Sequence, residues 1–198
     1  MNSDFLSPAA VILAVTAAVS VLALYRMPGL INRFVMRPYE VARGRSVETV
    51  VSSGFVHGDL QHLLFNLITF YFFAFPMEFF LGPVGFTVLY ALGLVVSSTC
   101  SIVKERNNPR YATLGASGAI SAVLFAYIVY FPFDGIFIFP IPVPIPAFLF
   151  AFGYVGYSMW AAKSQRDNIN HDAHLCGALT GLAFVLVNDP QAFAGLLD

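Results

Sequence analysis

Residues 115–132 read GASGAISAVLFAYIVYFP, a stretch of eighteen residues without one charged side chain. A helix of about 20 apolar residues is long enough to span the hydrocarbon core of a bilayer. Lipid offers no partner to backbone N–H and C=O groups, so a chain can cross it only as a helix or a closed barrel. Barrel strands alternate polar and apolar residues, and this stretch does not. It is therefore predicted to be a membrane-spanning helix.

Five further apolar stretches flank this one, separated by the charged residues. The six predicted spans cover approximately residues 8–25, 60–81, 84–103, 115–132, 144–162 and 173–188. Of the 198 residues, 58% are hydrophobic and 11% are charged, whereas soluble domains carry about 25% charged residues. We therefore expect an all-α, polytopic membrane protein, with residues 1–198 forming a single domain built as a six-helix bundle.

The segments outside the six spans have their own signatures. Residues 1–7 carry Asp4 and no Lys or Arg, so the first run is expected to be a retained span rather than a signal peptide. Residues 26–61 hold five arginines and suggest short amphipathic pieces at the membrane surface. Residues 131–146 carry prolines at alternate positions near their end, which predicts an extended interfacial linker.

The charge and the cysteines exclude other classes of protein. The formal net charge is −1 and there is no basic tail, so no nucleic-acid partner is expected. Cys100 and Cys176 lie far apart in apolar runs, without the spacing of a metal or redox site. We predict that both are buried small side chains.

Few polar side chains interrupt the predicted spans, and ionisable groups inside a bilayer are costly and usually functional. The ionisable ones are His62, Glu78 and His174, and the most polar uncharged one is Asn66. All four histidines of the chain fall in two clusters, at residues 57–62 and 171–174, and each cluster leads into a span.

Small residues predict a close contact between the fourth and sixth spans. Gly177 and Gly181 lie four residues apart, so they form one face that can approach another helix. His174 lies three residues before Gly177 on the same face. A helix carrying Ser117 could therefore bring its hydroxyl to this histidine, which is the arrangement that nucleophilic catalysis requires. Taken alone, the motif GASG around Ser117 is better explained by helix packing.

The second span contributes His62 and Asn66, which share one helix face because they are four residues apart. Attack on an amide carbonyl creates an oxyanion, which fixed hydrogen-bond donors stabilise. Both side chains can donate. The alternative for this pair is a hydrogen bond between two helices.

Three motifs together resemble the rhomboid family of intramembrane serine proteases: G-x-S-G at 115–118, A-H-x-x-G-x-x-x-G at 173–181, and H-x-x-x-N at 62–66. The similarity runs from about Tyr39 to Val187. It implies that Ser117 is the nucleophile and His174 the general base. It also implies that an oxyanion hole is formed by His62, Asn66 and the backbone N–H of Ser117. The residues with an implied supporting role are Gly115, Gly118, Gly177, Gly181, Glu78 and His57.

The same resemblance implies an activity, partners and a location. The substrates would be transmembrane or juxtamembrane segments of other proteins, reached within the lipid bilayer, and no cofactor or metal would be needed. The substrate would enter between the second and fifth spans, past Phe65, Tyr157 and Trp160. The protein would be a multi-pass component of a bacterial inner or plasma membrane.

One departure from the family affects the general base. Bacterial rhomboids carry a tyrosine four residues after the serine, packed under the histidine ring, and this chain has Ser121 there. The orientation of His174 is therefore unexplained by the sequence, with Ser121 and Asp172 as the candidates.

Two other functions remain open at this point. A non-catalytic rhomboid relative that binds membrane proteins would share the bundle, but such relatives typically lack the serine or the histidine. A metal site or transporter could be built from the four histidines and Asp172. The chain has no H-E-x-x-H signature, however, and Ser117 would then have no role.

The positive charges predict an orientation. All ten Lys and Arg residues lie in segments 26–61, 104–114 and 163–172, which six spans would place on one side of the membrane. Positive charge in short loops is retained in the cytoplasm. Bacterial rhomboids usually open their site outward instead. From the charges we expect the N-terminus outside and a site that opens to the cytoplasm.

Overall fold

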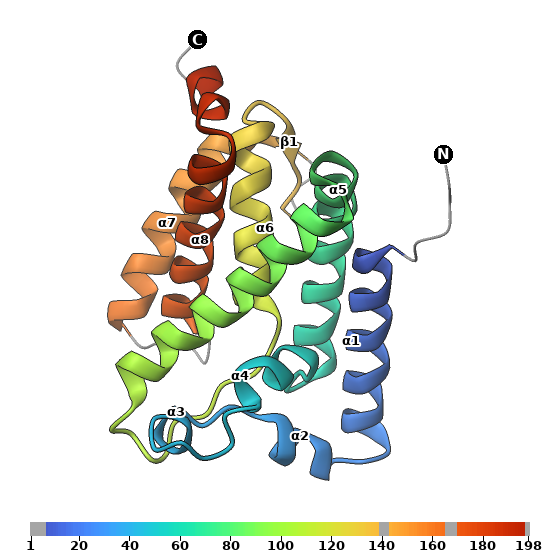
Figure 1. Ribbon diagram of the computed structural model, residues 1–198, viewed down its shortest axis with the longest axis vertical. Helices are drawn as coiled ribbons and strands as arrows, with labels where there is room; N and C mark the ends of the chain where they lie inside the picture. The colour runs from blue at the N-terminus through green and yellow to red at the C-terminus, as the bar shows by residue number, and fades with distance from the viewer. Residues whose placement is uncertain (1–6, 139–142, 165–169, 197–198) are drawn as a thin grey trace.

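The computed structural model describes residues 7–138, 143–164 and 170–196, and the helices gather around a central one, α6 (Figure 1). The helical elements are α1 (Pro8–Tyr25), α2 (Gly29–Phe34), α3 (Pro38–Val41), α4 (Thr49–Ser52), the 3₁₀ helix η1 (Ser53–Phe55), α5 (Leu60–Glu105), α6 (Ser117–Tyr130), α7 (Ala147–Ser164), α8 (His171–Asn188) and the 3₁₀ helix η2 (Pro190–Leu196). The expectation of a mainly helical chain is confirmed.

Helix α5 consists of two arms that meet at Gly82. This glycine has φ 74° and ψ 165°, in the left-handed region that residues with a Cβ rarely adopt, and Pro83 follows it. The first arm lies beside α1, and the second runs back diagonally across the bundle towards the start of α8 (Figure 1). The turn therefore falls where the second and third spans were predicted to separate.

Helix α6 is shorter than the predicted span over 115–132, because it begins at Ser117 and ends at Tyr130. Its fourteen residues rise about 21 Å, less than the thickness of the hydrocarbon core of about 30 Å. Nearly all of its side chains are buried. Helices α5 and α8 pack along α6, so its side chains contact protein. The length of α6 therefore does not have to match the thickness of the lipid hydrocarbon core.

By length and composition, two helices of the described part of the chain are able to cross a membrane, α1 and α5. Helices α6 and α7 contain shorter apolar stretches. Large apolar side chains also point away from the bundle, among them Phe79, Phe152 and Val187, which are 92%, 77% and 80% exposed. Such an outer surface matches lipid better than water.

The glycine face of α8 lies against α6. A Cβ added at Gly177 would lie 2.0 Å from the carbonyl oxygen of Gly118, and one at Gly181 would lie 2.1 Å from that of Ala122. The two backbones approach this closely only because neither position of α8 carries a side chain.

The connecting segments contain short helices and a small hairpin. Residues 26–61 form the short helices α2, α3, α4 and η1, which lie together at one end of the bundle (Figure 1). The linker before α7 was predicted to be extended, and in it β1 (Gly135–Ile136) pairs antiparallel with β2 (Ile145–Pro146). The all-α expectation is corrected by this small hairpin. Pro140 and Pro142 lie outside the described residues.

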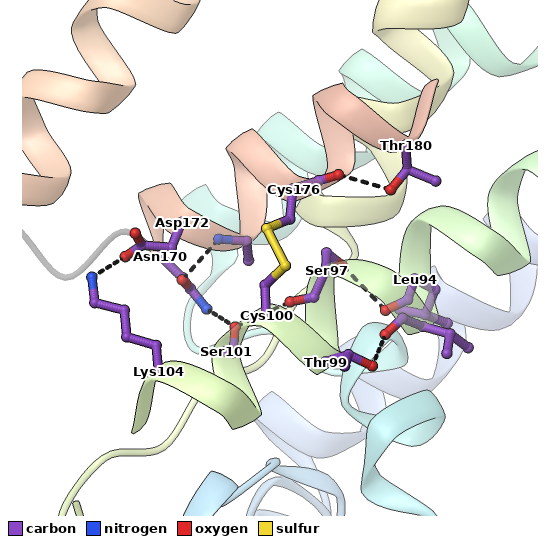
Figure 2. Close-up of a disulfide and its surroundings, with 12 residues drawn as sticks. Leu94, Ser97, Thr99, Cys100, Ser101, Lys104, Asn170, Asp172, Cys176 and Thr180 are labelled. Atoms are coloured by element: carbon purple, nitrogen blue, oxygen red, sulfur yellow. Dashed lines mark hydrogen bonds and ion pairs between the residues drawn. A yellow bond between two sulfur atoms is a disulfide. The ribbon is translucent and has the colours of Figure 1, made fainter. Parts of the chain in front are cut away.

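The prediction that the two cysteines are separate buried side chains is wrong. Cys100 on the second arm of α5 and Cys176 on α8 form a disulfide (Figure 2). They are 76 residues apart in the sequence, and the spacing could not reveal that the two helices cross at this point.

Candidate active site

Ser117 and His174 meet where α6 and α8 begin. The His174 Nε2 atom lies 2.7 Å from the Ser117 Oγ atom. Ser117 is the first residue of α6, and His174 is in the first turn of α8. The contact is within the range for a serine hydroxyl and the base that removes its proton.

The start of α8 is fixed by Asn170, a residue that the sequence analysis missed. Its side-chain oxygen accepts a hydrogen bond from the backbone N–H of Ala173 at 3.1 Å, which caps the helix. Its Nδ2 atom donates to Ser101 on α5 at 2.7 Å (Figure 2). The same atom lies 3.2 Å from the Oγ1 atom of Thr113. The cap explains why α8 begins at His171, two residues before the predicted start. An asparagine just before an apolar helix was the available signal.

Two further links hold α8 to the second arm of α5 near His174. Lys104 forms an ion pair with Asp172, and the Cys100–Cys176 disulfide lies one turn further along (Figure 2). Asp172 was a candidate for orienting His174, but its carboxylate is directed to Lys104. The effect of these links is to place the first turn of α8 relative to α5.

A polar cavity of about 1070 Å³ lies over the Ser117–His174 pair. Its walls come from the start of α5, the far end of α5, the segment before α6 and the start of α8. The cavity is therefore built from both ends of α5 together with the two helices that carry the pair. The cavity lining includes the sequence-predicted residues His62, Phe65, Asn66, Ser117 and His174, together with Asn170.

His62 and Asn66 line this cavity from the first arm of α5. Asp59 caps that helix by accepting from the backbone N–H of His62 at 2.7 Å, which places His62 in the first turn. Asn66 Nδ2 donates to the His62 carbonyl at 2.9 Å. This bond uses one of the two amide hydrogens, so the amide retains a second one for another acceptor.

Gly115 makes room for the His62 ring beside Ser117. Its φ of +110° is rarely adopted by residues with a Cβ, and an added Cβ would lie 2.7 Å from Cε1 of His62. Gly118 is equally restricted, because a Cβ there would lie 2.2 Å from Ser97 Oγ on α5. The two glycines that flank the serine thus allow contacts on both sides of it.

A third donor is available beside these two side chains. The first four N–H groups of a helix have no partner within that helix. Ser117 is the first residue of α6, so its backbone N–H belongs to this set. A helix N-terminus also carries a partial positive charge, which favours an anion placed there.

His57 and Glu78 tie α1 to the rest of the fold. The Nδ1 atom of the fully buried His57 lies 2.9 Å from Ser20 Oγ, and Ser20 in turn donates to the carbonyl of Phe55. Because that hydroxyl has one hydrogen, His57 is the donor to Ser20. Burial, followed by the charge of nearby His62, lowers the pKa of His57 to about 4, so it is neutral at ordinary pH.

Glu78 binds the N-terminus of α1 from the far end of the first α5 arm. Its Oε2 atom accepts from Ser7 Oγ and from the backbone N–H of Ala9, both at 2.7 Å. A carboxylate is stabilised at the N-terminus of a helix, where the N–H groups and the helix dipole both favour negative charge. His57 and Glu78 are thus placed for structural contacts at opposite ends of α1.

The histidines do not converge on a metal-like arrangement in the part of the chain that the structure describes, where no group of three or more His, Cys, Asp or Glu could hold an ion. His57 packs edge-on against His62 at a ring-centroid distance of 4.8 Å, and His171 packs edge-on against His174 at 6.0 Å. The two clusters each form a ring pair.

Comparison with known protein families shows to which family this chain belongs. Residues 44–188 match the model of the Rhomboid domain, which is more than half of the chain. The chain belongs to the rhomboid family. A curated rhomboid relative is RHOMBOID-like protein 12, mitochondrial, of Arabidopsis thaliana, which is 27% identical. The match covers 75% of this chain and 48% of that protein, so the chain spans about half the length of this relative.

Proposed function

We propose that this rhomboid is an intramembrane serine endopeptidase that cleaves transmembrane or juxtamembrane segments of other membrane proteins. The observation that carries the proposal is the 2.7 Å contact between His174 Nε2 and Ser117 Oγ. The cavity over this pair can admit water, and the hydrogen-bond donors beside it can stabilise an oxyanion.

The first half of the reaction uses this pair directly. His174 removes the proton of the Ser117 hydroxyl, and the oxygen attacks the scissile carbonyl of the substrate. The tetrahedral oxyanion is held by the backbone N–H of Ser117 and by side-chain donors of His62 and Asn66. His174 then returns the proton to the leaving amine, which releases one product and leaves an acyl group on Ser117.

Water completes the cycle through the same residues. His174 removes a proton from the water that attacks the ester, and Ser117 regains its proton when the second product leaves. The polar cavity gives this water a path to a serine that would otherwise be enclosed by apolar helices. An acidic third member of the serine-protease triad is not part of this proposal, so modest turnover is expected.

The proposed membrane architecture has six spans, with the two arms of α5 counted separately. The substrate would then approach from the bilayer, between the first arm of α5 and α7. Phe65 on α5 and Tyr157 and Trp160 on α7 are each at least half exposed and are the proposed gate side chains. The bilayer and transmembrane proteins are the proposed partners.

Labelling with a fluorophosphonate probe tests the proposed activity. Such probes react with an activated serine, so the purified protein should be labelled and the Ser117→Ala variant should not. A wild-type protein that neither labels nor cleaves any transmembrane substrate would contradict the proposal. It would favour a non-catalytic, membrane-protein-binding rhomboid.

Removing the proposed oxyanion donors should slow the reaction without removing the nucleophile. Loss of one such donor typically costs about 10²–10³-fold in rate. We expect Asn66→Ala and His62→Ala to lower kcat by about this factor, while the probe still labels Ser117. Steady-state cleavage of a transmembrane substrate measures the effect. Wild-type rates in both variants would show that other groups hold the oxyanion.

We further propose that the cavity opens to the cytoplasm. The basic residues described in the structure belong to segments at the cavity end of the bundle, and positive loops stay inside. The disulfide at the same end favours the opposite orientation, since disulfides persist in oxidising compartments. The charge pattern includes every basic residue of the chain and supports the cytoplasmic side.

Reporter fusions at the C-terminus decide this orientation. With six spans both termini lie on one side, so a C-terminal alkaline phosphatase fusion in a bacterial host should be active and a GFP fusion dark. An inactive phosphatase fusion paired with a fluorescent GFP fusion would reverse the assignment.

A further inference from the structure

Tyr154 on α7 lies beside the ring of His174. The two rings are stacked, with centroids 6.3 Å apart and planes 29° apart. Aromatic rings interact favourably at centroid distances of about 4.5–7 Å. A flat side chain against one face of an imidazole limits the rotation of that ring about its bond to Cβ. This rotation decides where Nε2 points relative to the hydroxyl of Ser117.

Tyr154 is itself held in place. Its hydroxyl lies 2.8 Å from the hydroxyl of Ser121, which is buried on α6. Its ring also packs against Phe125 of α6 at 5.4 Å and against Phe150 of α7 at 5.8 Å. A side chain fixed at its hydroxyl and along its ring is able to constrain a neighbour, whereas a mobile one would not.

Ser121, which anchors Tyr154, lies on the helix that carries Ser117. Ser121 follows Ser117 by four residues, so both lie on one face of α6, about one turn apart. A serine side chain is much shorter than a tyrosine, and the Ser121 hydroxyl is directed to Tyr154. Serine at this position therefore leaves space that a ring from the neighbouring helix α7 fills.

We infer that Tyr154 is the positioning residue of the general base, and that the hydroxyl of Ser121 sets its place relative to Ser117. This inference rests on the proposed protease function. The tyrosine acts through His174 and does not touch the substrate. The supporting ring thus comes from α7, while the hydroxyl that anchors it comes from α6.

Three variants separate the parts of this arrangement. Tyr154→Leu removes the ring, Tyr154→Phe keeps the ring and removes its hydroxyl, and Ser121→Ala removes the anchor. Phe152→Leu is the matched control, because it makes the same kind of change on the same helix at a side chain that is 77% exposed.

Loss of the ring should lower kcat and leave KM almost unchanged, because the base is misoriented while the binding surface persists. A misplacement of about 1 Å costs on the order of 10²-fold in rate, so we expect Tyr154→Leu to lose about 10–100-fold in kcat. Fluorophosphonate labelling should slow by the same factor. Tyr154→Phe should lose less than Tyr154→Leu because it keeps the ring, and Phe152→Leu should behave as wild type.

The hydrogen bond is tested by a double-mutant cycle. Tyr154→Phe and Ser121→Ala should each lower kcat about 5-fold, the worth of about one hydrogen bond. The double variant should lose no more than either single one, because both remove the same bond. This cycle also decides the matter if Tyr154→Leu fails to fold, since the two conservative changes preserve the packing.

The outcomes separate this inference from the proposed function. An active wild type with full kcat in Tyr154→Leu would overturn the positioning role and leave the protease assignment intact. Additive losses in the double-mutant cycle would overturn the role of Ser121. An inactive, unlabelled wild type would overturn both proposals. A thermal unfolding midpoint for each variant shows whether a loss of kcat merely follows a loss of folding.

Discussion

Replacing Ser117 or His174 with alanine should abolish cleavage of a transmembrane substrate while the protein remains folded. The two side chains meet at 2.7 Å and act as one unit, so removal of either one removes the activated nucleophile. In enzymes with such a unit, the loss in kcat is about 10⁴-fold or more. Cleavage by purified protein in liposomes, followed on gels, measures it.

The double variant gives the sharper result. Because nucleophile and base work together, Ser117→Ala with His174→Ala should be no worse than either single change. The matched control is Ser98→Ala, which alters a buried serine on α5 whose hydroxyl bonds to the carbonyl of Val50, away from the pair. This control should keep its activity. Substantial cleavage by Ser117→Ala would end the assignment of the nucleophile.

Gly181→Val should destabilise the bundle and remove activity together. Even one Cβ at this position would lie 2.1 Å from the carbonyl oxygen of Ala122 and 3.0 Å from the backbone nitrogen of Ala126. Both are backbone atoms of a buried helix, so α6 and α8 must separate. Overpacking of this kind costs about 3 kcal/mol, which lowers Tm by about 6–12 °C. Gly177→Val should act in the same way.

Gly156→Val is the control for this experiment. An added Cβ there meets nothing within 4 Å, so a valine on α7 should leave Tm within about 2 °C of wild type. A Gly181→Val protein that is inactive but unfolds at the wild-type temperature would show that the helices do not pack through this face in the membrane.

The sequence predicted the features that depend on local spacing. The turn at Gly82 follows from a glycine and a proline between two apolar runs, and the structure has its break there. The glycine face of α8 follows from a repeat of four residues. Ser117 and His174 could be paired because each opens an apolar helix next to small residues, although they are 57 residues apart.

The features that the sequence did not predict depend on crossings between distant helices. Tyr154 is one of nine tyrosines in the chain, and no spacing links it to Ser121 or to His174. The disulfide was missed for the same reason, since the path of the second α5 arm decides which cysteines meet. The ends of α6 were placed too far out because hydropathy alone does not distinguish lipid from a surrounding layer of protein.

The Cys100–Cys176 bond also changes the covalent topology of the chain. It closes a ring that contains α6, α7 and the first turn of α8, and both Ser117 and His174 lie inside that ring. A single peptide-bond cut between Ser117 and His174, for example in the hairpin connection 131–146, would therefore open the ring without dividing the molecule. Ser117 and His174 would then belong to two polypeptides, which the disulfide would keep covalently linked until it is reduced.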